Sequence, residues 1–205
     1  MQEPSLNKRQ LVIATKNRGK LEEFKVALQG LDLTFLSLYD FPQLPPIIED
    51  GAAFAANAFI KANTVVQYTK LPALADDSGL EVDFLGGAPG VLSARFAGRD
   101  GDDAANNTKL LRLLDGVPKP LRTARFRCVL AVVTNTGKVL TATGTIEGYI
   151  GTELRGSGGF GYDPLFVVPE YKCTLSELSL AEKNAISHRG KALKKLRNII
   201  KDIFV

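Results

Sequence analysis

The sequence predicts an α/β fold with a mixed β-sheet. Short apolar runs, typical of buried strands, alternate along the chain with segments whose apolar residues recur at helical spacing. A long hairpin is expected in the second half, which adds antiparallel pairing to the sheet. No repeat, low-complexity tract or linker interrupts this pattern, and a chain of 205 residues fits one domain, or one domain with two lobes.

The first half of the chain is expected to hold three strands, two helices and a further extended piece. In chain order these are a strand at 11–14, a helix that follows the turn 15–20 and stops at Gly30, a strand at 33–38, a proline-rich loop at 42–51, a helix capped by Asp50, a strand at 72–75 that ends in the polar stretch 76–79, and an extended piece at 80–84. Strands and helices therefore alternate here.

The second half is expected to be richer in strands. In chain order it holds a glycine-rich loop at 86–90, a helix from an Asp102 cap to Gly116, a hairpin of strands 125–133 and 139–150, a glycine-rich loop at 156–161, a strand at 165–168, a helix that begins with the capping box of Ser179 and Glu182, and a final helix capped by Ser187. Together the two halves predict the mixed sheet.

Small residue counts limit the chemistry. Two cysteines, Cys128 and Cys173, and one histidine, His188, fall short of the common four-ligand zinc sets. Two cysteines in a chain of this size are typical of reduced thiols in a cytoplasm. The segment 1–10 is polar, without the apolar run of a signal peptide, and no stretch approaches about 20 apolar residues. We therefore expect a soluble cytoplasmic protein without a membrane segment, in which carboxylates are the best-supplied catalytic groups.

The overall charge is mildly basic. A net charge of +4 allows an anionic ligand but does not indicate a nucleic-acid partner. The densest basic stretch, 189–201, interleaves its Lys and Arg residues with Leu193, Leu196, Ile199 and Ile200. This spacing is that of a packed helix with a solvated basic face, which we favour over a nucleic-acid patch.

The strand–turn–helix unit at 11–28 has the architecture of a phosphate-binding site. Turn amides and a helix N-terminus direct donors and partial positive charge at an anion, and Lys16, Arg18 and Lys20 add formal charge. The unit is not a Walker A loop, because Ala14 stands where that motif needs Gly and Leu21 where it needs Ser or Thr. An ordinary basic turn explains the pattern equally well.

Two adjacent carboxylates, Asp76 and Asp77, follow an apolar strand. The carboxyl end of a strand is where α/β proteins place ligands. Successive residues of an extended chain face opposite ways, so only one of the two can face a given cleft, and the other would support it or cap a turn. A turn without a ligand is the alternative interpretation.

A second group of polar residues lies near the start of the helix predicted after the proline-rich loop. Glu49 and Asp50 open this helix, and Asn57 and Lys61 are expected one turn apart on its surface. Carboxylates here and at Asp77 could share Mg²⁺, which takes one or two protein carboxylates and completes its shell with water and phosphate oxygens.

The glycine-rich loop and the last helix offer groups for a nucleobase. Four of the six residues at 156–161 are glycine, which lets the backbone approach a ligand. Phe160 within it offers a stacking face, and Tyr162, Asp163 and Pro164 before a strand indicate an ordered loop rather than a flexible turn. His188 is a lone histidine, which is usually structural, but it stands at a donor-rich helix start.

Taken together, these segments resemble the inosine triphosphate pyrophosphatases, also called non-canonical purine nucleoside triphosphate or dITP/XTP pyrophosphatases. The resemblance runs from Leu11 to the last helix. Five blocks carry it in order: 15–20; 49–51 with Asn57 and Lys61; 75–80 with 86–90; 158–164; and Lys183 with 186–190. Each block alone is modest, but chance agreement of all five in order is remote.

The resemblance implies a single domain, 1–205, in which an elongated mixed sheet and its flanking helices form two lobes around a central cleft, usually as a homodimer. It implies Mg²⁺-dependent hydrolysis of the small molecules ITP, dITP and XTP to the monophosphate and pyrophosphate, which cleanses the nucleotide pool. Glu49 and Asp77 would hold magnesium, and Asp77 would also be the base for the attacking water. The residues implied to bind substrate are Thr15, Lys16, Asn17, Arg18, Gly19, Lys20, Lys61, Ser78, Phe160, Gly161, Tyr162, Asp163, Lys183, His188 and Arg189.

One position departs from the family pattern, and two other functions stay open. Lys16 stands where many members carry Gly, which alters the turn but adds favourable charge. A pyrophosphatase of a related fold family that acts on pyrimidine or modified nucleotides would use the same chemistry. A non-catalytic nucleotide- or RNA-binding module would fit the charge and the glycine loops, but leaves Glu49 and Asp77 without purpose.

Overall fold

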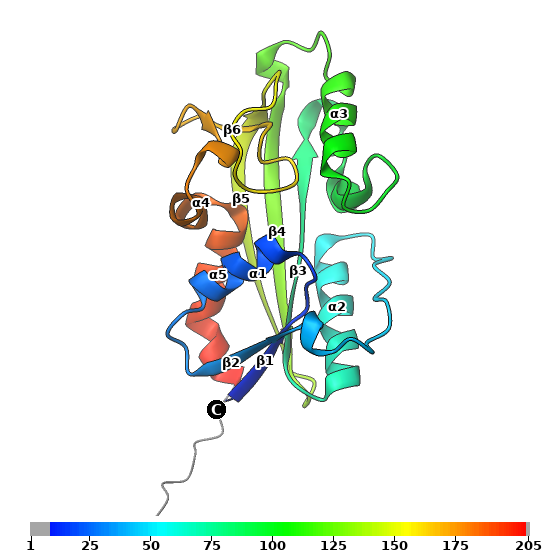
Figure 1. Cartoon of the computed structure of the whole chain (residues 1–205), viewed down its shortest axis with the longest axis vertical. Coiled ribbons are helices and arrows are strands. Elements are labelled where there is room, and N and C mark those ends of the chain that lie inside the picture. The colour runs from blue at the N-terminus through cyan, green and yellow to red at the C-terminus, as the bar shows by residue number, and fades with distance from the viewer. Residues whose placement is uncertain (1–8, 204–205) are drawn as a thin grey trace, which may run out of the picture.

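A seven-stranded mixed sheet runs along the long axis of the molecule in the computed structural model, which describes residues 9–203 (Figure 1). The strand order is β2-β1-β3-β4-β5-β6-β7. Strand β1 (Arg9–Ile13) pairs in parallel with β2 (Leu33–Ser37) and β3 (Ala73–Val82), and the other pairs are antiparallel. The predicted mixed α/β fold is confirmed.

Three long strands form the centre of this sheet. Strands β4 (Thr123–Val133) and β5 (Val139–Ile150) are the predicted hairpin, and β3 pairs with β4 along its whole length. Strands β6 (Phe166–Val168) and β7 (Cys173–Thr174) are short and end the sheet at the edge opposite β2. The three long strands therefore run from one end of the molecule to the other (Figure 1).

Helices cover both faces of the sheet. Their bounds are α1 (Arg18–Ala27), α2 (Phe54–Thr69), α3 (Asp103–Leu113), α4 (Leu180–Ile186) and α5 (His188–Ile199). Short 3₁₀ turns lie at Leu38–Asp40, Asp83–Leu85, Gly90–Arg95, Lys119–Leu121, Leu175–Glu177 and Ile200–Ile203. Within residues 9–203, no helix has the length and apolar character needed to cross a membrane.

The alternation of side chains along β3 divides the core. Ala73 and Ala75 pack with α2 on one face, whereas Leu74 between them packs with α1 and α5 on the other. A third cluster fills the far end of the molecule, where Leu80 and Val82 meet α3 and the segment 162–175. Helices on both faces explain why the middle of the sheet is apolar without interruption.

Most predicted helix caps are confirmed. Asp102 accepts from the amide of Ala105, Ser187 from Gly190, and Ser179 and Glu182 form the capping box of α4. The Asp50 cap is wrong, because α2 begins only at Phe54 with Ala53 as N-cap. The chain before α2 instead folds back onto its first turn.

The polar stretch 76–79 is not the end of a strand. The sequence predicted two separate extended pieces, but β3 continues through Asp76, Asp77, Ser78 and Gly79 because each pairs with β4. The two carboxylates therefore stand in the middle of a strand at the centre of the sheet. Their alternate orientation, which the sequence did predict, follows from the extended backbone.

Two remaining composition-based predictions can be compared with the described residues. Cys128 is buried, Cys173 is half-buried, and both are free thiols. Lys191, Lys194 and Lys195 form the predicted solvated face of α5, where Lys191 and Lys195 donate to strand β5. The signal-peptide prediction falls largely on residues 1–8, which lie outside the described residues, as does the side chain of Lys201.

Candidate active site

A cleft of about 630 Å³ opens over the middle of β3, between the turn before α1 and the loops at the far end of the sheet. Fifteen of the predicted site residues line it: Thr15, Lys16, Asn17, Lys20, Glu49, Lys61, Asp77, Ser78, Phe160, Gly161, Tyr162, Asp163, Lys183, His188 and Arg189. Arg18 and Gly19, also predicted, are outside this lining. The cleft thus brings together five segments that are far apart in the sequence.

The turn before α1 is held by its own side chains. Asn17 caps α1 by accepting from the Lys20 amide at 2.9 Å, and its own amide donates to Thr15 Oγ1 at 3.1 Å. Tyr39, in the 3₁₀ turn after β2, donates from its hydroxyl to the Lys16 carbonyl at 2.8 Å. These bonds fix the strand–turn–helix unit with its positive helix end toward the cleft, as an anion site requires.

Asp76 is a buried carboxylate that is bound by three polar side chains. It is 2% exposed, and its Oδ2 lies 3.0 Å from Lys20 Nζ, 3.1 Å from Arg189 Nη2 and 2.9 Å from Ser78 Oγ. Burial alone would raise its pKa, but Lys20 and Arg189 outweigh this and hold the pKa far below its ordinary value. Asp76 is therefore ionised and serves to orient its partners.

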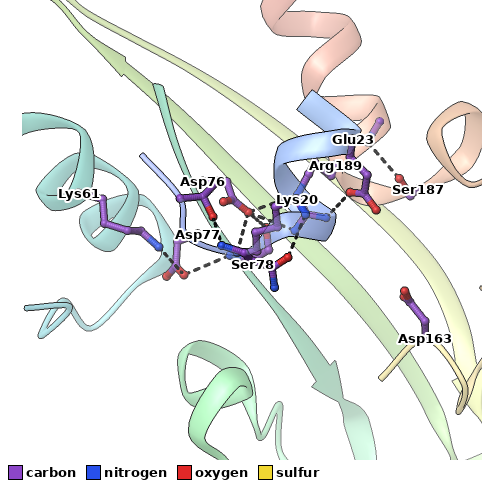
Figure 2. A network of polar contacts seen from close by, with 12 residues as sticks. Lys20, Glu23, Lys61, Asp76, Asp77, Ser78, Asp163, Ser187 and Arg189 are labelled. Atoms are coloured by element: carbon purple, nitrogen blue, oxygen red, sulfur yellow. Dashed lines mark hydrogen bonds and ion pairs between the residues drawn. The ribbon is translucent and has the colours of Figure 1, made fainter. Parts of the chain in front are cut away.

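Asp77 is also buried in β3, but its polar environment differs from that of Asp76. Its side chain points to the α2 side of β3, where Lys61 Nζ lies 3.5 Å from Oδ1 (Figure 2). Its Oδ2 is buried and has no hydrogen-bond partner among residues 9–203. Burial raises the pKa of Asp77, and the attraction of Lys61 only partly opposes this. A carboxylate with a spare oxygen and raised proton affinity can accept a proton from a reactant.

Lys61 joins the two predicted metal ligands. Its Nζ lies 2.8 Å from Glu49 Oε2 as well as near Asp77. Burial would lower the pKa of Lys61, but the carboxylates of Asp76, Asp77 and Glu49 outweigh it and raise the pKa, so the side chain stays charged. Asn57 and Lys61 do lie one turn apart on α2, as predicted, but the face of the helix that carries them is not exposed to solvent. They are 1% and 8% exposed, because this face of α2 packs toward the sheet and the loop before it.

Asn57 supports the loop that carries Glu49. Its Oδ1 accepts a hydrogen bond from the Gly51 amide at 2.8 Å. Asn57, within α2, therefore holds the chain before the helix, where a cap by Asp50 was expected. A Cβ at Gly51 would lie 2.6 Å from this oxygen, so the close approach requires glycine. Arg95 adds a second contact, from Nη2 to the Glu49 carbonyl at 3.3 Å.

On the other face of β3, Arg189 is buried rather than solvated. The helical spacing placed it on the basic face of α5, but it is 2% exposed and its guanidinium bonds Asp76 and Glu23. Glu23 also lies 2.7 Å from Lys183 Nζ, which in turn lies 2.7 Å from Asp163 Oδ2. Burial would raise the pKa of Glu23, but Arg189 and Lys183 lower it. Figure 2 shows Glu23 and Arg189 side by side, away from Lys61 and Asp77.

Arg95 and Asp103 line the cleft although they were not predicted, and Glu23, behind the lining, is the supporting residue that sequence reasoning missed. It sits in α1 among ordinary surface-type charges, and its partners are 160 or more residues away along the chain, with Arg189 at a separation of 166. Only its position beside the core residue Phe24 hints that it is buried. Its importance depends on contacts that no local pattern encodes.

The groups predicted to enclose a nucleobase do converge. Phe160 lies under two cations, with Lys183 Nζ 4.5 Å and Arg189 Cζ 5.6 Å from its ring centroid. His188 stacks on Phe126 at 4.8 Å between ring centroids. Burial, together with Arg189 and Lys183, holds the pKa of His188 well below its ordinary value, so the imidazole is neutral at pH 7.

The carboxylates fit a small, hard cation that shares its shell with substrate. Among the described residues, no group of three or more His, Cys, Asp or Glu side chains forms a ready-made metal cage. Glu49 and Asp77 nevertheless converge on Lys61, and Asp77 Oδ2 is a buried oxygen without a protein partner. One or two carboxylates, with the rest of the shell left to water and phosphate oxygens, is the donor set that Mg²⁺ uses.

Comparison with known proteins gives consistent matches over nearly the whole chain. A sequence model of the Ham1 family matches residues 11–199. A dITP/XTP pyrophosphatase of Desulforamulus reducens is 55% identical over 195 residues, which is 95% of this chain and 97% of that protein. One from Geobacter sulfurreducens is 53% identical over 188 residues, or 92% and 94% of the two chains.

Solved structures agree in fold. A HAM1 protein from Coxiella burnetii superposes with a TM-score of 0.86 at 42% identity, covering 95% of this chain and 99% of that chain. The Ham1 protein of Staphylococcus aureus gives a TM-score of 0.84 at 35% identity, over 95% and 100%. Family and fold are therefore both shared with these proteins.

The different environments of Asp76 and Asp77 predict unequal effects of their substitution on stability. Asp76→Asn removes the charge between Lys20 and Arg189 and should lower the free energy of unfolding by about 3–5 kcal/mol, as when one partner of a buried ion pair is lost. Asp77→Asn relieves a buried charge and should change it by less than about 1 kcal/mol. Urea unfolding at pH 7 measures both, and equal losses in the two variants would contradict the assignment.

Proposed function

The chain belongs to the Ham1 family, and we propose that it hydrolyses dITP, ITP and XTP to the nucleoside monophosphate and pyrophosphate. The relatives named dITP/XTP pyrophosphatases support this reaction. The observation that carries the proposal is the composition of one cleft. A basic turn, a carboxylate with a free oxygen and an aromatic loop with cationic neighbours line the same cavity. Removal of non-canonical purines from the nucleotide pool is the corresponding role.

The triphosphate would lie against the turn before α1. The amides at the start of α1, with Lys16 and Lys20, supply donors and positive charge there. Lys61 would contribute a third cation from the opposite side of the cleft, beside Asp77. These cations would neutralise the negative charge of the triphosphate, which otherwise opposes attack on its phosphorus atom.

Magnesium is part of the proposal, with Glu49 and Asp77 as its protein ligands. When bound, the ion would neutralise phosphate charge and lower the pKa of water in its shell. The sharing of Lys61 between the two carboxylates keeps them close together without metal. Asn57 and Arg95 hold the backbone that carries Glu49.

Asp77 would act as the base. Water attacks the α-phosphorus in line, its oxygen forms the new bond, and the bond from the α-phosphorus to the bridging oxygen breaks with pyrophosphate leaving. The Asp77 carboxylate would accept one proton of the attacking water. The raised pKa of Asp77 suits it to this transfer, because a base is most effective when its proton affinity is not far below the working pH.

Base choice would follow from the donors around the purine. Lys183 and Arg189 can only donate hydrogen bonds, and both lie beside the stacking face of Phe160. A C6 carbonyl, as in inosine and xanthosine, can accept, whereas the C6 amino group of adenosine would leave donor facing donor. Arg189 Nε, Nη1 and Nη2 each already contact a carboxylate, so it would act on the base chiefly by fixing its neighbours.

Three further statements belong to this proposal. The chain forms one two-lobed domain over 1–205, works as a homodimer and is cytoplasmic. The family match over most of the chain supports the first, the family resemblance supports the second, and the free thiols Cys128 and Cys173 support the third.

The choice of base tests the proposed function. We expect kcat/KM for ITP to exceed that for dATP by at least about 100-fold, since each unpaired buried polar group costs about 1–3 kcal/mol. Release of pyrophosphate, measured with both substrates and with dITP, XTP and dCTP, provides the profile. Equal rates with ITP and dATP would remove the proposed role, and a preference for dCTP would replace the substrate class.

The proposed roles of Asp77 as base and as magnesium ligand predict a loss of turnover that persists at saturating Mg²⁺. Asp77→Asn should lower kcat by about 10²- to 10⁴-fold, the usual contribution of a general base, while the protein stays folded. Single-turnover release of pyrophosphate from ITP measures this, with thermal unfolding as the check on folding. A variant that keeps near-normal turnover would show that another group accepts the proton.

A further inference from the structure

Helix α3 holds the backbone of one residue, Gly161, in the loop that faces the cleft. The Asn107 amide donates from Nδ2 to the Gly161 carbonyl at 2.9 Å, and the Gly161 amide donates to Asp103 Oδ2 at 2.7 Å. Asn107 and Asp103 are 54 and 58 residues from Gly161 along the chain. Both polar groups of Gly161 are therefore taken by side chains of one helix, spaced one turn apart.

The gripped residue lies between the groups that line the base end of the cleft. Phe160 precedes Gly161, and the Phe160 amide donates to Asp163 Oδ2 at 2.9 Å. Tyr162 follows, and its hydroxyl donates to the Ser93 carbonyl at 2.9 Å in the buried interior. Gly161 has a φ of +63°, so its peptide is turned in a way that other residues rarely adopt.

Among the described residues, the buried side chain of Asn107 has an unpartnered oxygen, which destabilises the fold and so indicates that the residue is present for a specific contact. It is 5% exposed, and its Oδ1 is buried with no hydrogen-bond partner among residues 9–203. An unpartnered amide oxygen is unfavourable in a core, where an apolar side chain would fill the same space without loss. Among residues 9–203, the Asn107 side chain makes one hydrogen bond, to the Gly161 carbonyl. We therefore take its function to be holding the loop.

We propose that Asn107 and Asp103 are positioning residues for purine selection, which hold Gly161 so that Phe160 and Asp163 keep the geometry needed to receive the base. The inference rests on the proposed function, because it names what the loop is positioned to bind. Helix α3 would thus set nucleoside affinity although its two residues act through the loop backbone. The phosphate turn touches Phe160 at Gly19, but the hydrogen bonds of Thr15, Asn17 and Tyr39 hold it, so pyrophosphate binding should depend on this grip less than nucleoside binding.

The test separates the two ends of the substrate. Asn107→Leu keeps the volume and removes the donor, and Asp103→Ala removes the acceptor from the exposed side. We expect each to raise KM for ITP and the inhibition constant of the product IMP by about three- to tenfold, the size of one net hydrogen bond. The inhibition constant of pyrophosphate and kcat should change by less than about twofold, because the turn that would hold the phosphates is fixed by its own hydrogen bonds.

Thr108→Ala is the matched control. Thr108 lies beside Asn107 on α3, but its hydroxyl bonds only the Ala104 carbonyl of its own helix, so its constants should equal those of the wild type. Thermal unfolding of all variants shows whether they are folded. If Asn107→Leu does not fold, the exposed Asp103→Ala variant still decides the question.

Two results would overturn the inference. Folded variants that bind IMP as tightly as the wild type would show that the grip does not position the loop. Equal weakening of IMP and pyrophosphate would show a general packing role. A different result would contradict the proposed function. If the wild-type enzyme has no activity on ITP, both that function and this inference are wrong.

Discussion

A chain of alternating charges, buried except at its Lys20 end, holds the site together. Three carboxylates and three cations form it without an excess of either sign; in order they are Lys20, Asp76, Arg189, Glu23, Lys183 and Asp163. Buried charges of this kind are tolerated only when each is paired and hydrogen-bonded. Because the members come from α1, β3, α4, α5 and the loop before β6, their pairing fixes how the turn before α1 meets the loop at 160–163.

This chain also explains how two neighbouring carboxylates acquire different tasks. Strand β3 directs Asp76 into the network and Asp77 to the opposite face, toward Lys61. The cations that surround Asp76 lower its pKa, whereas burial dominates at Asp77 and raises its pKa. One extended backbone thereby supplies a structural anion and, under the proposed function, a reactive one at adjacent residues.

Local patterns predicted much of the fold, and the family resemblance named most of the residues that line the cleft, but neither predicted the buried ion pairs that connect them. Periodicity and capping residues are short-range signals, so the hairpin, the caps at Asp102 and Ser187 and the alternation of the two Asp residues could be predicted. The continuity of β3 depends on its pairing with β4, and the burial of Arg189 depends on Glu23, at a separation of 166 residues. Such long-range pairing has no local signature.

Site-specific titration of the two carboxyl groups tests this account most directly. Carbon-13 NMR of the free protein, assigned through Asp76→Asn and Asp77→Asn, would follow each carboxyl as the pH is lowered. We expect Asp77 to take up its proton above the ordinary value of 3.8 and Asp76 to stay ionised until the protein unfolds. Protonation of Asp76 before Asp77, or of both together near 3.8, would contradict the division between a structural and a reactive carboxylate.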